Sequence, residues 1–145
     1  MKLARQQPLS IPLFGVLSAD DETISSAAFL EHFSRSDDPR HRLIYYTNNP
    51  LKTTDRRIQC RKSQHPEQKI INFSHPCIPI APTNHYLGMN GEFLASMTTS
   101  KKMVYGASTA SNIKLHKHHL ARLSYNPDFI HMMNSAMAFI QSVLP

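Results

Sequence analysis

Short apolar runs and amphipathic stretches follow one another along this chain. Three runs rich in apolar, β-branched or aromatic residues are typical of strands, at residues 11–17, 41–47 and 69–74. Two other segments repeat their apolar positions at helical spacing, at residues 24–35 and 127–143. An apolar run without polar alternation, as in 11–17, fits a strand buried on both faces of a parallel sheet. The pattern therefore predicts an α/β fold with three parallel strands and right-handed crossovers.

Both predicted helices have suitable starting residues. Thr23 or Ser25 can cap the first helix. In the second, Asn126 is a good cap and Pro127 fits the first helical position. The second helix also has a single apolar face, which we expect to fill part of the core, formed by Ile130, Met133, Met137 and Ile140.

Two adjacent carboxylates follow the first predicted strand, where the next helix is about to begin. Asp20 and Asp21 thus lie at the carboxyl end of a buried strand, and ligand-binding and catalytic groups gather at that edge of open α/β sheets. The same two residues can instead cap the following helix, because a helix N-terminus favours negative charge. The residues of this segment alone leave both interpretations open.

His75 directly follows the third predicted strand, 69–74, and begins a proline-rich loop. If that strand is parallel to the first, His75 and Asp21 lie at the same edge of the sheet. We therefore expect their side chains to approach each other there. The alternative is a purely structural histidine in the loop.

Three patches, taken in order, resemble the second half of an α/β-hydrolase-fold serine hydrolase of the bacterial lipase, esterase or lysophospholipase type. The patches are PLFGVLSADDETI at 12–24, FSHPCIPIAPTNHYLG at 73–88 and HHLARLSYNPDF at 118–129. The resemblance implies an ester or lipid-like substrate and a catalytic triad. In that triad Asp21, or less favourably Asp20, orients His75, and His75 moves a proton to and from a serine nucleophile.

The nucleophile motif of that family is missing from this sequence. In the family a G-x-S-x-G elbow precedes the acid, but no such motif precedes Asp21. We therefore expect residues 1–145 to form a single, incomplete α/β-hydrolase-like domain in which the N-terminal half of the fold is absent. Such a chain would be inactive alone and would need a complementing N-terminal half.

One near-match to the elbow occurs downstream, at residues 106–110, GASTA. Its serine, Ser108, comes after both the acid and the histidine, which reverses the order of the family, and no convincing helix follows it. Ser108 is therefore a weak candidate for the nucleophile.

The remaining histidines and the cysteines give little sign of metal chemistry. His116 and His119 would share one face of a helix, but no nearby carboxylate or thiolate completes a zinc or copper site, so we favour a solvated turn without a metal or cofactor. His116 or His118 is the fallback for the base if His75 is structural. Cys60 and Cys77 form no C-x-x-C pair, which favours a reducing, cytoplasmic compartment.

The formal net charge of +6 does not by itself indicate a nucleic-acid partner. Lysine and arginine are scattered, and no aromatic residues interleave with them as a base-stacking surface requires. No apolar run approaches the length of a membrane span. The alternative to a hydrolase is a small basic α/β adaptor or binding protein without catalytic activity, which would use exposed strand edges to bind a partner.

Overall fold

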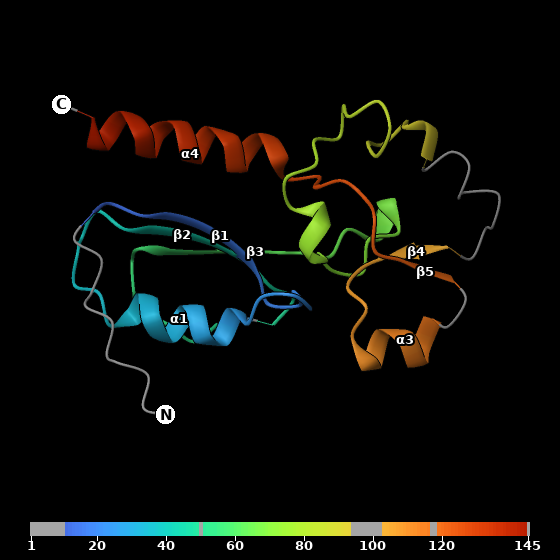
Figure 1. Cartoon of the computed structure of the whole chain (residues 1–145), viewed down its shortest axis with the longest axis horizontal. Coiled ribbons are helices and arrows are strands. Elements are labelled where there is room, and N and C mark those ends of the chain that lie inside the picture. Colours follow the sequence, from blue (N-terminus) through green and yellow to red (C-terminus); the bar gives the residue numbers. More distant parts are fainter. Residues whose placement is uncertain (1–10, 50, 94–102, 117–118, 145) are drawn as a thin grey trace.

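Three parallel strands form the main sheet. The structure is a computed structural model that describes residues 11–49, 51–93, 103–116 and 119–144. The strands are in the order β1-β2-β3, with β1 at Phe14–Ser18, β2 at Arg42–Tyr46 and β3 at Ile58–Arg61. Helix α1, Ser26–Ser34, covers one face of this sheet and helix α4, Phe129–Val143, covers the other (Figure 1). The predicted parallel α/β arrangement with two flanking helices is thus confirmed.

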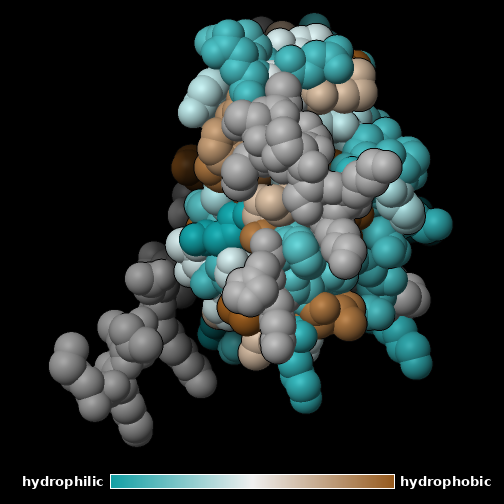
Figure 2. All heavy atoms as spheres, turned by 90° about the vertical axis from the view of Figure 1, so that its right-hand side faces the viewer, coloured by the Kyte–Doolittle hydropathy of each residue, from teal (hydrophilic) through white to brown (hydrophobic). Residues whose placement is uncertain are grey.

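A smaller unit lies beside the carboxyl end of the main sheet (Figure 1). It contains the two parallel strands β4, Val104–Tyr105, and β5, Leu120–Ala121, with helix α3, Ala110–His116, between them. Two 3₁₀ turns, η1 at Pro66–Gln68 and η2 at His75–Cys77, occur in the connection from β3 to β4. Figure 2 faces this end of the molecule and shows mostly hydrophilic side chains with smaller hydrophobic areas among them.

Helix α1 packs closely on the main sheet because β1 contains a glycine. A Cβ added at Gly15 would lie 3.1 Å from Leu43 Cδ1 and 3.3 Å from the Phe29 ring, so a larger residue would require these two side chains to shift. The cap is Ser25, whose hydroxyl accepts the N–H of Ala28 at 3.3 Å, and Thr23 does not serve as the cap. One core cluster on this face includes the buried residues Leu17, Phe33, Leu43 and Tyr45.

Helix α4 is held against the opposite face by a polar anchor at its first turn. The Asp128 carboxylate accepts hydrogen bonds from the Tyr46 hydroxyl at 3.0 Å and from Arg61 Nε at 2.9 Å. Tyr46 and Arg61 belong to β2 and β3, so this one carboxylate joins the start of the helix to two strands. The helix begins at Phe129 rather than at Pro127. The side-chain oxygen of the buried Asn126 accepts the N–H of Asp128 at 2.9 Å, and its amide donates to the Ile78 carbonyl at 3.1 Å.

The predicted strand at residues 69–74 is wrong. The third strand of the sheet is β3, where the sequence gives only a weak strand signal, whereas Ile70 and Phe73 are fully buried in an irregular segment. The segment follows a left-handed turn at Lys69, which has a φ of 59°. Its backbone pairs with β4, since Ile71 N–H donates to the Tyr105 carbonyl at 2.9 Å. The apolar pattern correctly indicated burial but not the pairing partner.

The prediction that the apolar face of α4 fills the core is also wrong. The four predicted core positions are exposed, and Met132 is the buried methionine of the helix; the exposed four are Ile130, Met133, Met137 and Ile140. The inward face instead carries Ser135 and Phe139, which help to line a cavity of about 590 Å³ against Phe14. Periodicity shows that a stripe exists, but the Asp128 anchor decides which side of the helix faces the sheet.

Within the residues that the structure describes, no helix combines the length and the apolar character that crossing a membrane requires.

We predict that Phe73 contributes core packing although it is not in a strand. The centroid of its ring lies 4.7 Å from the centroid of the Tyr46 ring. Phe73→Leu should therefore lower the free energy of unfolding by about 1–3 kcal/mol. Tyr86→Leu, at a half-exposed position, is the control and should cost less than about 1 kcal/mol. Urea unfolding monitored by circular dichroism measures both, and equal costs for the two variants would contradict the assignment.

Candidate acid–base site

Asp21 uses its two carboxylate oxygens for different purposes. Oδ1 accepts the backbone N–H groups of Thr23 at 2.7 Å and Ile24 at 2.9 Å, which fixes the turn between β1 and α1. Oδ2 lies 2.7 Å from Nδ1 of His75. The side chain of Asp21 is only 2% exposed. Ser25 caps α1, so the alternative that Asp21 caps this helix is wrong. Asp21 instead fixes the turn before the helix and contacts His75.

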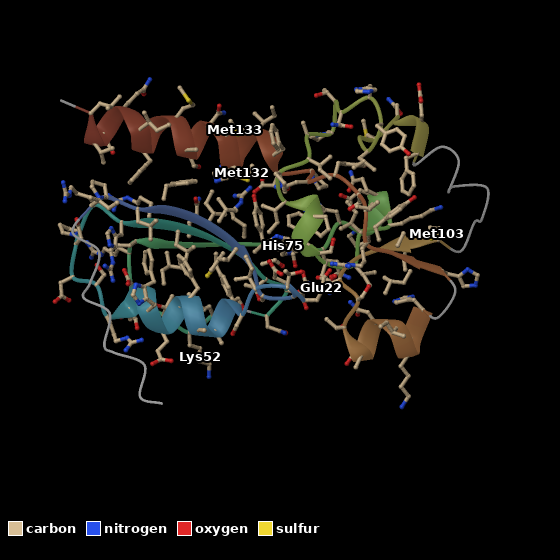
Figure 3. The ribbon with its side chains drawn as sticks, in the orientation of Figure 1. Glu22, Lys52, His75, Met103, Met132 and Met133 are labelled. Carbon is tan, nitrogen blue, oxygen red and sulfur yellow. The ribbon has the colours of Figure 1, made fainter. Side chains whose placement is uncertain are left out.

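His75 approaches Asp21 at the carboxyl end of the main sheet, as the sequence predicted. It does not follow a strand of that sheet, however, because it is the first residue of the turn η2. Its side chain is 42% exposed, and among the described residues Nε2 has no hydrogen-bond partner. Figure 3 shows His75 and Glu22 close together where the main sheet meets the smaller unit. One ring nitrogen is thus held by a carboxylate and the other is open.

The charge state of Asp21 determines how the imidazole can act. Burial alone would raise the pKa of Asp21, but hydrogen bonds from His75, Ile24 N–H and Thr23 N–H outweigh it and lower the pKa below its ordinary value. The carboxylate is therefore ionised at neutral pH and can only accept hydrogen bonds. Nδ1 must then carry the proton of the neutral ring, which leaves the lone pair on Nε2. This is the orientation of a general base that faces outward.

The buried hydroxyl of Ser18 positions the histidine segment against the end of β1. Ser18 Oγ donates to the Phe73 carbonyl at 2.8 Å, across 55 residues of sequence, and accepts the N–H of Asp20 at 3.2 Å. The bond holds the chain two residues before His75 beside the chain that carries Asp21. Sequence reasoning missed this residue, although a small polar residue at the end of an apolar strand is a visible signal for such a tie.

A second link comes from the smaller unit. The Arg122 guanidinium, just after β5, forms an ion pair with the Glu22 carboxylate, and Glu22 Oε2 also lies 3.5 Å from the backbone nitrogen of His75. Ser74 strengthens this link, because its hydroxyl donates to the Arg122 carbonyl. Nothing local in the sequence points to Glu22 or Arg122, since their pairing joins positions 100 residues apart.

The carboxylate of Asp20 lies in a different environment from that of Asp21. Burial raises the pKa of Asp20, and a side-chain hydrogen bond with Asn72 offsets only part of the increase. Asn72 also accepts the N–H of Ala107 at 2.8 Å, so Asp20 belongs to the contact between β1 and the smaller unit. Of the two adjacent carboxylates, Asp21 is the partner of His75.

The weak nucleophile candidate Ser108 lies in the loop between β4 and α3. A helix does follow it, contrary to expectation, and Ser108 lines a cavity of about 500 Å³ together with Pro76 and Arg122. Among the described residues, however, no hydrogen bond joins Ser108 to His75, and Lys69 is the only non-glycine residue with a positive φ. The strained backbone of a nucleophile elbow is therefore not present at Ser108.

The other reactive side chains do not supply a competing site. Burial raises the pKa of the Cys77 thiol to about 12, so Cys77 is not a thiolate nucleophile. His116 ends α3, and His118 is outside the described residues. In the part of the chain that the structure describes, no three histidine, cysteine, aspartate or glutamate side chains are placed to hold a metal ion. The fallback bases are not needed to complete the pair with Asp21.

Comparisons with known proteins gave no match, either to a family model, to a curated protein or to a solved structure.

We predict that the two adjacent aspartates titrate on opposite sides of the ordinary value of 3.8. Carbon-detected NMR of the side-chain carboxyl groups should give a midpoint below 3.8 for Asp21 and above 3.8 for Asp20. Asp21 should then stabilise the fold above its unfolded pKa, and this contribution should disappear as pH falls through the lowered native pKa.

The sign is opposite for Asp20, whose contribution is present below its unfolded pKa and is lost as pH rises through the raised native pKa. At pH 7, Asp21→Asn should therefore lower the free energy of unfolding, and the matched variant Asp20→Asn should leave it unchanged or raise it. A higher titration midpoint for Asp21 than for Asp20 would contradict the assignment of the roles.

Proposed function

We propose that Asp21 and His75 are the acid and the base of a serine ester hydrolase with a partial α/β-hydrolase fold. The observation that carries the proposal is the 2.7 Å contact between Asp21 Oδ2 and His75 Nδ1, with Nε2 left open. A triad histidine needs this arrangement, since one ring nitrogen is oriented by the carboxylate and the other exchanges a proton with the serine. The three sequence patches support the same assignment.

The mechanism would be acyl transfer. Nε2 of His75 takes the proton of a serine hydroxyl as its oxygen attacks the ester carbonyl, and the resulting imidazolium is stabilised by the Asp21 carboxylate. His75 then gives the proton to the departing alcohol, and the acyl group stays on the serine. A water molecule, deprotonated by the same nitrogen, releases the acid and restores the serine.

The cavity next to His75 is consistent with an ester of apolar character. Its volume is about 500 Å³, and five of its seven lining residues are apolar, namely Pro76, Phe93, Leu120, Ala121 and Leu123, while Ser108 and Arg122 are polar. Apolar clefts of this size bind the non-reacting part of small ligands. This supports a carboxylic ester or lipid-like substrate for the intact enzyme.

The serine and the oxyanion-binding amides would come from a polypeptide segment that carries a G-x-S-x-G elbow. Without them the imidazole of His75 is only a weak base toward an ester. The low activity that remains when a triad loses its serine is also absent, because that activity depends on the oxyanion hole. We therefore propose that this chain supplies half of a composite active site.

We predict that the chain alone neither hydrolyses nitrophenyl esters above the rate of its His75→Ala variant nor reacts with a fluorophosphonate probe. The coding sequence upstream of Met1 should encode a G-x-S-x-G segment in frame or after a frameshift, and adding that polypeptide should produce hydrolysis. His75→Ala should reduce this activity by at least about a thousandfold, whereas His85→Ala, at an exposed histidine, should not change it.

Two results would reject the proposal. One is full activity of the complemented His75→Ala variant. The other is probe labelling of the chain alone that Ser108→Ala abolishes, which would make Ser108 the nucleophile of a different arrangement. Monodisperse protein is required, because open strand edges favour aggregation.

A non-catalytic adaptor is the second candidate function. It is favoured by the main sheet, in which β1 and β3 each pair on one side only among the described strands. Such edges can bind a strand of another chain. An upstream sequence without an elbow segment would support this alternative.

A further inference from the structure

Helix α4 presents an apolar stripe to solvent. The stripe consists of large side chains on one side of the helix and its end, with exposed fractions of 66% for Ile130, 41% for Met133, 51% for Met137, 43% for Ile140 and 64% for Leu144. The opposite side of the helix contacts the main sheet through Met132 and Phe139. A contiguous exposed surface of this kind commonly marks an interaction site.

The spacing of the stripe is that of a helix-pairing seam. Within the helix, successive members are separated by three, four and three residues, which is the a and d pattern of a heptad repeat, and Leu144 follows four residues later just past the helix end. This pattern makes a narrow stripe suited to one partner helix rather than a broad face suited to a core. The occupant with the matching shape is therefore another helix.

The helix cannot bury this stripe by turning over. Asp128, immediately before its first residue, is held by Arg61 in a two-pronged ion pair and by the Tyr46 hydroxyl. Met132 is buried in the core beside these groups. Rotation of α4 would leave the Asp128 carboxylate and the Arg61 guanidinium without each other. Among the described residues the stripe consequently stays outward.

We propose that the occupant is α4 of a second copy of this chain, packed across a two-fold axis near Met137. Met137 is the middle member of the stripe, so a two-fold axis near it packs the stripe of one copy along the stripe of the other. The 15 residues of α4 contain no aspartate, glutamate, lysine or arginine. No aspartate, glutamate, lysine or arginine of α4 therefore opposes its equivalent when two copies meet, and the remaining charges of a chain with net charge +6 are screened at physiological ionic strength.

The same absence of charge argues against two other occupants. A helix that lies in a membrane surface carries lysine and arginine on its polar face, and α4 has neither. Different helices that pair selectively use complementary charges beside the seam to choose each other, and α4 offers none. This inference is independent of the proposed acid–base function, because no residue of the stripe belongs to that site.

The dimer should be weak and reversible. Fifteen helical residues extend over only about 22 Å, so the interface lies at or below the low end of specific interfaces, roughly 1,200 Å². We expect a dissociation constant on the order of 10 μM.

Sedimentation velocity of the full chain over a range of concentrations tests the proposal. The wild type should change from monomer to dimer, and Met137→Glu, which places a carboxylate at the centre of the seam, should raise the dissociation constant by at least about tenfold. Met89→Glu is the matched control: it makes the same substitution at a methionine that is 56% exposed elsewhere on the molecule, and should leave the dissociation constant unchanged. Circular dichroism should show that both variants remain folded.

A cross-linking experiment locates the axis. In a Cys60→Ser background, which removes the exposed native thiol, Met137→Cys should form a disulfide-linked dimer on mild oxidation and Met89→Cys should not. A monomer at every concentration would overturn the proposal and leave the stripe to a different partner, with binding to neutral lipid vesicles as the first alternative to examine. A dimer that Met137→Glu does not weaken, or a wild-type dimer whose Met137→Cys variant does not cross-link, would overturn it as well.

Discussion

The hydrogen bond from the Ser18 hydroxyl to the Phe73 carbonyl is the contact on which the site depends. The segment before His75 is not a strand of the main sheet, so no ladder of backbone hydrogen bonds holds it beside β1. The buried Ser18 hydroxyl holds it there instead, at 2.8 Å, together with the side-chain hydrogen bond between Asp20 and Asn72. Such a bond contributes about 0.5–1.5 kcal/mol net, but the loss of its donor leaves a buried carbonyl unsatisfied at a cost of about 1–3 kcal/mol. The ion pair of Glu22 with Arg122 supports the same junction from the other side.

Asp21 illustrates how one carboxylate can be both structural and functional. Its Oδ1 satisfies two backbone N–H groups ahead of α1, and those bonds, with the bond from His75, keep it ionised despite its burial. An ionised, fixed carboxylate is also what orients an imidazole. The turn that begins α1 thus prepares the group that holds His75, and neither role excludes the other.

Local sequence patterns predicted the parts of the fold that depend on neighbours in sequence. The apolar run before Ser18 and the segment HRLIYYT gave β1 and β2, and helical periodicity gave α1 and α4. The pattern of apolar residues could not distinguish a strand from an irregular core segment at 69–74, because Ile70 and Phe73 would be buried in either one. It also could not give the rotation of α4, which depends on the pairing of Asp128 with Arg61 across 67 residues. The order of motifs indicated that Asp21 and His75 would meet, whereas Ser18, Glu22 and Arg122 act through contacts that only the folded chain reveals.

The central claim is that Asp21 orients the imidazole of His75 so that Nε2 is the free base. The side-chain ¹⁵N chemical shifts of His75, recorded at a pH where the ring is neutral, test this most directly. They should show a protonated Nδ1 and a bare Nε2 in the wild type, and Asp21→Ala should remove this preference because nothing else accepts from Nδ1 among the described residues. A wild-type ring protonated at Nε2, or the same tautomer in both proteins, would contradict the account.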